Sequence, residues 1–239
     1  MKILLLGYGK MGKAIEKIAL ERGHTIVGKI VTQNRADMDQ LQSNDVDVAI
    51  EFSSPESAFD NITYCLKKGW PIVSGTTGWL ERRTEIEKLC KETNGSFFYA
   101  SNYSIGVNLF FRLNRQLARL MNGQGYQATM TEIHHIHKLD APSGTAITLA
   151  EGVIEETADL EGWILAPESE QNYLEIVSER EGEVPGTHIV RYDSEVDRIE
   201  ISHTAHNRLG FALGAVISAE WLSGKEGVFG MNDLLKNLD

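Results

Sequence analysis

Histidine and lysine side chains are concentrated in one short stretch of the sequence. Three of the seven histidines lie within four positions, at His134, His135 and His137, and Lys138 follows them directly. Imidazole and ammonium groups this close together can transfer protons near neutral pH and bind anions. A metal cluster is a second interpretation, but no cysteine is nearby, and the rings of His134 and His135 would point to opposite faces of a strand. A histidine-rich, solvated strand is a third.

The residues that follow favour anion binding. Pro142-Ser143-Gly144-Thr145 is a typical helix start, with Ser143 as the N-cap. The backbone N–H groups of Gly144 and Thr145 would then lie at the positive end of a helix dipole, where a carboxylate is stabilised. Gly144 has no side chain to block that approach. We therefore predict that this segment binds a small dianion and that it holds no metal.

A glycine-rich turn near the N-terminus predicts a dinucleotide site. Gly7-Tyr8-Gly9-Lys10-Met11-Gly12 fits the pattern G-x-G-x-x-G, after an apolar run at Lys2–Leu6 and before an amphipathic stretch at 10–22. The first glycine permits the tight turn, the second lets a pyrophosphate approach the backbone, and the third lets helix and strand pack closely. Lys10 adds a positive charge. A turn without a ligand is the alternative.

The adenosine end of this predicted site is unusual. An acidic residue commonly ends the second strand of such domains and binds the ribose, but here the strand runs into Thr32-Gln33-Asn34-Arg35. Thr32 could bond to a ribose hydroxyl and Arg35 could meet a 2′-phosphate. The sequence therefore predicts NADH or NADPH as cofactor, without a preference.

Two further loops follow predicted strands, at 75–78 and 100–104. Loops at the carboxyl ends of parallel strands line the ligand crevice of such sheets. Small residues there would let a nicotinamide ring approach. Ordinary turn chemistry accounts for the same residues.

The first hundred residues alternate between short apolar runs and amphipathic helical stretches. The predicted strands are Lys2–Leu6, 25–31, 46–52, 71–74 and 96–100, and the predicted helices are 10–22, 55–68 and 80–93. Nearly continuous apolar strands that alternate with helices indicate an α/β, Rossmann-like parallel sheet covered on both faces.

The pattern changes after residue 106. The predicted helices are 107–122 and 143–157, the alternating strands are 126–137, 173–178, 188–192 and Arg198–Thr204, and a polar loop occupies 166–173. Such strands indicate a smaller α+β domain, with one sheet face solvated or used for assembly. Residues 211–238 return to a helical pattern. We predict a dinucleotide-binding domain at 1–105, a substrate-binding and oligomerisation domain at 106–210, and C-terminal helices at 211–239 that return to the first domain.

Charge and composition restrict the class of protein. The net charge of −11 repels nucleic acid, and no basic run is present. The N-terminal apolar run stops after five residues, and no window of eighteen apolar residues occurs, so we expect a cytoplasmic protein without a membrane span. Cys65 and Cys90 lie among apolar neighbours, which favours reduced, packed thiols.

The stretch from Glu132 to Ala146 reads E-x-H-H-x-x-K-x-D-A-P-S-G-T-A and closely resembles the hallmark of the dihydrodipicolinate reductase family. The resemblance extends over the whole chain and includes the residues at 75–78, 100–106, 182–188 and 221–227. It implies the NAD(P)H-dependent reduction of 4-hydroxy-tetrahydrodipicolinate in lysine and diaminopimelate biosynthesis. It also implies a homotetramer built through the second domain's sheet. The chain departs from the family in being shorter between residues 32 and 45 and in having Thr32 where an acidic residue is common.

The resemblance also assigns roles to single residues. His134 would be the acid/base and Lys138 the proton donor. His135, Lys138, Gly144 and Thr145 would hold the carboxylates of a small dicarboxylate substrate. The cofactor would contact Gly7, Tyr8, Gly9, Lys10, Met11, Gly12, Thr32, Gly75, Thr76, Thr77, Ala100, Ser101, Asn102 and Tyr103. Two other functions stay open: an aspartate or homoserine dehydrogenase, and a nucleotide-sensing protein without catalysis.

Overall fold

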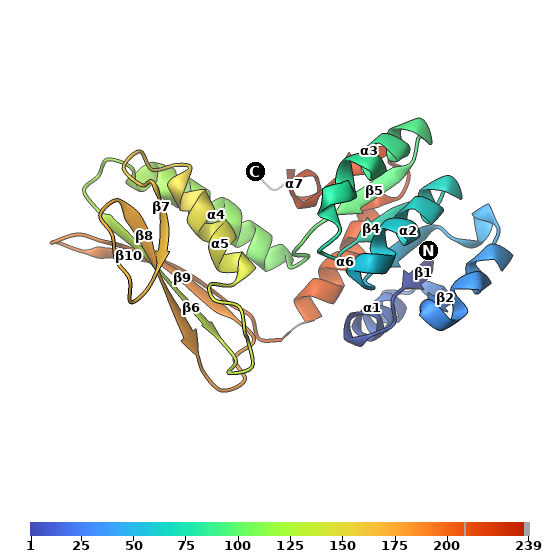
Figure 1. Cartoon of the computed structure of the whole chain (residues 1–239), viewed down its shortest axis with the longest axis horizontal. Coiled ribbons are helices and arrows are strands. Elements are labelled where there is room, and N and C mark those ends of the chain that lie inside the picture. The colour runs from blue at the N-terminus through green and yellow to red at the C-terminus, as the bar shows by residue number, and fades with distance from the viewer. Residues whose placement is uncertain (208, 237–239) are drawn as a thin grey trace. The chain divides into compact units, whose positions relative to one another are not determined.

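The computed structural model describes residues 1–207 and 209–236 and consists of two compact units. The first unit comprises residues 1–105 together with the chain from 209 onward, and the second comprises the residues between them (Figure 1). No helix in the described part of the chain is both long enough and apolar enough to cross a membrane.

The first unit is built on a six-stranded sheet in which every pair of neighbouring strands is parallel. The strand order is β11-β5-β4-β3-β1-β2. The strands are β1 (Lys2–Leu6), β2 (Thr25–Ile30), β3 (Val48–Glu51), β4 (Ile72–Ser74), β5 (Ser96–Tyr99) and β11 (Gly227–Phe229). The predicted Rossmann-like sheet is confirmed, with one strand more than the sequence pattern indicated.

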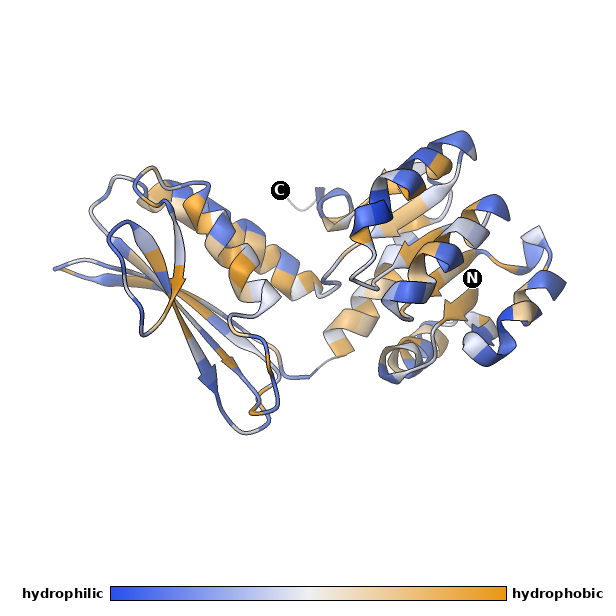
Figure 2. Cartoon of the chain, viewed as in Figure 1, coloured by the Kyte–Doolittle hydropathy of each residue, from blue (hydrophilic) through white to orange (hydrophobic). Residues whose placement is uncertain are grey.

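Helices cover both faces of this sheet. Ile3 and Leu5 of β1 belong to one buried cluster and Leu4 and Leu6 to another, as the alternation of side chains along a strand requires. The first cluster includes side chains of α1 (Lys10–Glu21) and α6 (Leu209–Leu222), and the second includes side chains of α2 (Pro55–Lys67) and α3 (Arg83–Glu92). Figure 2 shows the apolar strands of this sheet and hydrophilic residues on the outer sides of α2 and α3.

The C-terminal segment differs from the prediction of continuous helix over 211–238. Helix α6 ends at Leu222, the chain turns at Gly224 with φ +74°, and β11 then pairs with β5 before α7 (Met231–Leu234). A strand of three residues that itself begins with glycine is too short to show a period of two, so the sequence pattern did not predict it. Residues 237–238 of the predicted helix lie outside the described residues.

The second unit has a five-stranded mixed sheet in the order β10-β9-β6-β8-β7. Its strands are β6 (Gln127–His134), β7 (Gly162–Leu165), β8 (Tyr173–Arg180), β9 (Thr187–Asp193) and β10 (Arg198–Thr204). β9 pairs antiparallel with β6 and β10, whereas β8 pairs parallel with β6 and β7. Side chains of α4 (Ile105–Met121) and α5 (Gly144–Ile154) share a buried cluster with Met130, Ile176 and Val190 of the sheet. The polar loop predicted before Tyr173 is confirmed, but β7 was not predicted.

The strand predicted at 126–137 ends at His134 instead. At this end the Glu181 N–H donates to the His134 carbonyl at 2.8 Å, and the chain then turns at Ile136 and His137. The expectation that His134 and His135 occupy opposite faces of one strand was therefore wrong, because His135 already belongs to the following loop.

Candidate active site

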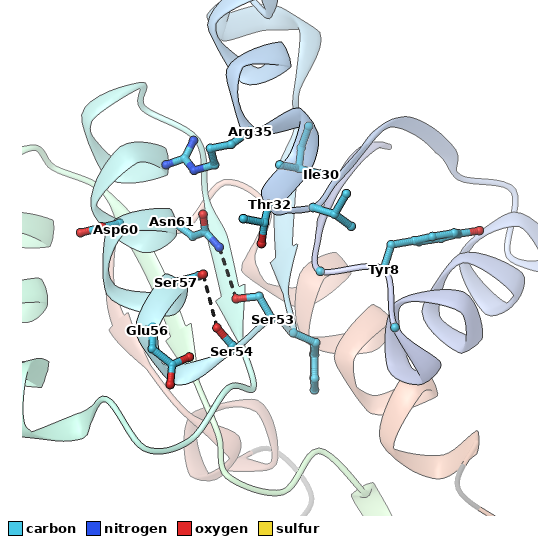
Figure 3. A pocket seen from close by; sticks show the side chains of 14 residues that line it. Tyr8, Ile30, Thr32, Arg35, Ser53, Ser54, Glu56, Ser57, Asp60 and Asn61 are labelled. Carbon is cyan, nitrogen blue, oxygen red and sulfur yellow. Dashed lines mark hydrogen bonds between the residues drawn. The ribbon is translucent and has the colours of Figure 1, made fainter.

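A pocket of about 440 Å³ opens in the first unit beside the glycine-rich turn (Figure 3). Its walls come from three segments, each of which follows a parallel strand. They are the turn at Gly7, Tyr8 and Gly9, the end of β2 with Thr32 and Arg35, and the loop after β3 with Ser53 and Ser54. The predicted crevice at the carboxyl ends of the strands is thus present, and four of the predicted cofactor residues line it.

The three glycines of the turn have three different surroundings. Gly7 has φ +93°, and a Cβ there would lie 2.0 Å from the carbonyl oxygen of Phe52. A Cβ at Gly12 would lie 2.3 Å from the Gly7 oxygen, whereas one at Gly9 would meet nothing within 4 Å. Gly9 is also the N-cap of α1, where no side chain bonds to the first N–H groups of the helix. This arrangement fits the phosphates of a dinucleotide.

Lys10, Met11 and Gly12 form the first turn of α1 and do not line the pocket. Gly12 acts through packing, as the short distance to Gly7 shows. Thr32 and Arg35 lie in a 3-10 segment, Thr32–Gln40, that directly follows β2. The sequence pattern did not indicate this segment.

The Arg35 guanidinium carbon lies 4.8 Å from the ring centroid of Tyr64. The guanidinium therefore stacks on a ring beside the pocket. Two carboxylates, Glu56 and Asp60, also line the pocket. They would repel a phosphate group, and the sequence analysis did not predict this repulsion.

The loop after β4 is tied to the loop after β3 by a buried carboxylate. Glu51 is fully buried and accepts hydrogen bonds from the Ser74 hydroxyl at 2.6 Å and the Thr76 hydroxyl at 2.8 Å. The Ser53 N–H donates to Glu51 Oε1 and to Thr76 Oγ1, at 2.9 Å each. Thr76 is therefore a buried linker, while its neighbour Thr77 is exposed. A Cβ at Gly75 would lie 2.2 Å from the Phe52 ring.

The loop after β5 contains both surface and core residues. Ser101 is exposed, Asn102 is half-buried and Ala100 is buried. The side chain of Tyr103 is buried, and its hydroxyl donates to the Ser74 carbonyl at 2.7 Å. Burial raises the pKa of this phenol. The Tyr103 side chain therefore supports the sheet, whereas the side chains of Ser101, Asn102 and Ser104 are at least partly accessible.

In the second unit, Glu132 is the centre of a buried polar cluster. Its carboxylate accepts bonds from the Ser143 N–H at 3.1 Å and from the Ser178 hydroxyl at 2.9 Å. His134 Nδ1 lies 3.2 Å from Oε2, an ion-pair distance. Burial alone would raise the pKa of Glu132, but bonds from His134, Ser143 and Ser178 lower it far below the usual range. Glu132 therefore stays ionised.

His188 on β9 faces the same cluster and was not predicted as a site residue. It pairs across the sheet with Glu132, and its ring centroid lies 5.2 Å from that of His134. Its Nε2 lies 3.3 Å from the Ser143 hydroxyl. Burial, and next the charge of His134, lower the pKa of His188 to about 4. This imidazole is therefore neutral at pH 7.

Glu132, His134 and His188 are residue types that bind metals, and their ligand atoms lie within 4.8 Å of one another. The Glu132 oxygens, however, already accept bonds from Ser143 and Ser178, and the Arg180 guanidinium lies 3.3 Å from the same carboxylate. These contacts account for the cluster as a hydrogen-bonded unit. Of the three histidines grouped in the sequence, only His134 belongs to it.

The remaining predicted substrate residues lie on the loop between β6 and α5 and on the first turn of α5. The Lys138 ammonium lies 2.7 Å from both oxygens of Asp140, and this ion pair lowers the pKa of Asp140. Ser143 caps α5 as predicted, because its hydroxyl accepts the Ala146 N–H at 3.2 Å. Gly144 is exposed, and a Cβ there would meet nothing within 4 Å.

The segment at 182–188 lies beside His134 and the first residues of the loop that follows it. The Ile136 N–H donates to the Gly182 carbonyl at 3.1 Å. Gly186 has φ +152°, and a Cβ there would lie 3.0 Å from His134 Nε2. Glycine at position 186 therefore leaves room for the histidine ring. His135 and Thr145 are both half-buried, the first in this loop and the second in the first turn of α5.

A parallel sheet with an open glycine turn, joined to a mixed-sheet unit with a lysine-containing loop at a helix start, defines a two-unit dinucleotide-binding protein. Two family models match the chain: "Dihydrodipicolinate reductase, N-terminus" over residues 1–103 and "Dihydrodipicolinate reductase, C-terminus" over residues 106–235. The chain belongs to the dihydrodipicolinate reductase family, which confirms the resemblance of the hallmark segment.

Individual proteins agree with this assignment. The chain is 50% identical over its full length to a 4-hydroxy-tetrahydrodipicolinate reductase of Christiangramia forsetii, and covers 99% of that protein. It is 36% identical to a protein of the same name from Methanopyrus kandleri, over 81% of this chain and 72% of the relative. A dipicolinate-bound dihydrodipicolinate reductase from Paenisporosarcina sp. TG-14 shares the fold, with a TM-score of 0.81 and 21% identity over 98% of this chain and all of that one.

Proposed function

We propose that this protein reduces 4-hydroxy-tetrahydrodipicolinate to tetrahydrodipicolinate with NADH or NADPH, in lysine and diaminopimelate biosynthesis. The full-length relative at 50% identity carries the name of that activity. The observation that carries the proposal is the loop between β6 and α5, where Lys138 precedes the open, capped helix start at Gly144.

The substrate carboxylates would bind at this loop and helix start. The N–H groups at the start of α5 lie at the positive end of the helix dipole, and Gly144 leaves them accessible. His135, Lys138 and Thr145 would complete the site. Lys138 would exchange its bond to Asp140 for one to the ligand. The ammonium group would then bind the Asp140 carboxylate in the free protein and a substrate carboxylate in the complex.

Bound NAD(P)H would supply a hydride, and the protein must supply a proton and neutralise negative charge. Loss of water, made of the 4-hydroxyl and a proton from C3, leaves a carbon–carbon double bond conjugated to an imine. Reduction at C4 moves electron density to nitrogen as an enamine, and C3 then needs a proton. An ammonium group held beside a substrate carboxylate can donate that proton, which is the role of Lys138. His134 would move protons with the ionised Glu132 behind it, which stabilises the protonated imidazole.

The first unit would hold the cofactor. The pyrophosphate would bind at Gly9 and the N-terminus of α1, where a Cβ would find open space. Thr32 and Arg35 would meet the adenosine ribose. Loop residues after β4 and β5, including Thr77, Ser101 and Asn102, would contact the nicotinamide end.

A coupled assay tests the proposal. 4-Hydroxy-tetrahydrodipicolinate is generated enzymatically, and the absorbance of NADH or NADPH is followed in parallel reactions. Consumption of either cofactor that depends on the substrate supports the proposal. Turnover of aspartate or homoserine with NAD(P)⁺ would favour another dehydrogenase, and NADH binding without turnover of any dicarboxylate imine would favour a nucleotide sensor.

We also propose a cytoplasmic homotetramer that is assembled through the sheet of the second unit. Strand β10 is an edge strand of that sheet, and Ile199 on it is 39% exposed. Both cysteines are free and buried, which suits a reducing compartment. Light scattering should give four times the chain mass of 26.6 kDa, and a monomer would contradict the assembly.

A further inference from the structure

Two charged side chains hold the loop that carries Lys138. The loop begins after His134 and ends at Ser143, whose N–H is held by the carboxylate of Glu132 at 3.1 Å. Its middle is held by Arg180, the last residue of β8. A loop that is fixed at its two ends and in its middle has few conformations left to lose when a ligand binds.

Arg180 makes a separate bond with each part of its guanidinium group. Nη2 donates to the carbonyl of Asp140 at 2.7 Å and lies 3.3 Å from Oε1 of Glu132. Nε donates to the carbonyl of Lys138 at 3.3 Å, and Nη1 donates to the Glu179 carbonyl at 2.7 Å. The side chain is only 21% exposed. The two loop carbonyls belong to the same two residues whose side chains form the ion pair between Lys138 and Asp140.

We propose that Arg180 is a positioning residue: it fixes the backbone on both sides of Leu139 and so places the Lys138 ammonium group for substrate binding and proton transfer. The inference rests on the proposed function, because it assumes that Lys138 acts on the substrate. Arg180 itself would act through Lys138, without touching the substrate.

The chemistry of the side chain explains why arginine is required. A planar guanidinium with five N–H donors can bond to two carbonyls and a carboxylate at fixed angles. A lysine at this position would keep the positive charge beside Glu132, but its donors all lie on one nitrogen, whereas separate nitrogens of Arg180 reach the Lys138 and Asp140 carbonyls. The role is therefore a matter of geometry as well as charge.

A double-mutant cycle with Arg180→Gln and Lys138→Ala tests this role in the full-length protein. Arg180→Gln should lower kcat/KM by about 10²-fold, the size of effect that a misplacement of about 1 Å produces. In the Lys138→Ala background the same substitution should cost less than about threefold, because the group that it positions is gone. Arg180→Lys should fold, keep the charge and recover only part of the loss. Binding of pyridine-2,6-dicarboxylate should weaken in both Arg180 variants, whereas NADPH binding should be unchanged.

Arg119→Gln is the matched control, since Arg119 pairs with Glu156 at the surface of α4, away from the loop. It should keep wild-type kinetics. Wild-type activity in both Arg180 variants, or full multiplication of the two losses in the double variant, would overturn the positioning role. If Lys138→Ala alone keeps normal activity, the proposed assignment of the substrate site fails instead, so the two failures are distinguishable. If Arg180→Gln does not fold, the cycle is carried out with Arg180→Lys. Wild-type activity of that variant, or full multiplication of the two losses, would again overturn the positioning role.

Discussion

Both carboxylate oxygens of Glu132 lie 3.1 Å from the backbone nitrogen of Ser143, eleven residues further along the chain. The same carboxylate lies 3.2 Å from His134 Nδ1. One buried anion thus fixes the candidate proton-transfer histidine and the N-cap of the helix that is proposed to bind substrate. In the segment from 132 to 146, the buried Glu132 carboxylate therefore fixes the positions of residues on both sides of the proposed substrate-binding loop.

His134 and Lys138 should fail in different ways when substituted. His134→Gln should lower kcat, with a smaller change in KM, because the residue acts on proton movement. Lys138→Ala should lower kcat and raise KM, because it both donates a proton and neutralises a carboxylate. Each loss should be about 10² to 10⁴-fold. Steady-state kinetics with a parallel NADH titration checks this, and near-normal kcat in His134→Gln would make the residue only a structural histidine.

Acid should destabilise the protein through His188 before it affects Glu132. The pKa of His188 is lowered from 6.5 to about 4 in the folded state, so its contribution to stability is present above pH 6.5 and is lost as the pH falls toward 4. Between pH 7 and 5 this linkage should remove about 2 kcal/mol of unfolding free energy. The lowered pKa of Glu132 acts in the same direction, but only below its ordinary value of 4.5.

Urea unfolding of wild type and His188→Gln at pH 7 and pH 5 measures the His188 contribution. Gln keeps an amide near the Ser143 hydroxyl and does not titrate. The variant should therefore lose less stability over this interval than the wild type. Equal losses in the two proteins would show that His188 does not control this part of the pH dependence.

Substitutions at two glycines of the cofactor turn should separate effects on folding stability from effects on cofactor binding. Gly9→Ala should leave the unfolding temperature nearly unchanged, because its Cβ meets nothing within 4 Å, yet it should weaken NADPH binding by roughly tenfold or more. Gly7→Ala should destabilise the fold, because the residue has φ +93° and its Cβ would lie 2.0 Å from the Phe52 oxygen. Thermal unfolding and fluorescence titration give both quantities. Unimpaired NADPH binding in Gly9→Ala would place the pyrophosphate elsewhere.

We predict that NADH and NADPH are both used, with less than a tenfold preference for either, roughly 1.4 kcal/mol. Arg35 offers a cation to a 2′-phosphate, while Glu56 and Asp60 in the same pocket repel it. Arg35→Gln should weaken NADPH more than NADH, and Asp60→Asn should do the opposite. The ratio of kcat/KM for the two cofactors measures this, and a wild-type preference well beyond tenfold would mean that another group discriminates.

The sequence was most informative where one short segment contains the whole pattern. The turn from Gly7 to Gly12 and the cap at Ser143 depend on neighbours a few residues away, so spacing alone predicted them. His188 and Arg180 reach Glu132 only through the register of β9 and β8 against β6, which a single sequence does not contain. Ser53 and Ser54 line the cofactor pocket but were not predicted as site residues, because their contribution to a pocket depends on three strands lying side by side.

The most direct test of the proposed reaction follows an isotope from the cofactor to the substrate. NADPH that carries deuterium at the transferable position of C4 is mixed with enzymatically generated 4-hydroxy-tetrahydrodipicolinate and the protein, and the product is analysed by mass spectrometry. We expect tetrahydrodipicolinate with one deuterium at the ring C4, formed in step with NADPH consumption and nearly abolished by Lys138→Ala. Unlabelled product, or bound NADPH that is never consumed, would contradict it.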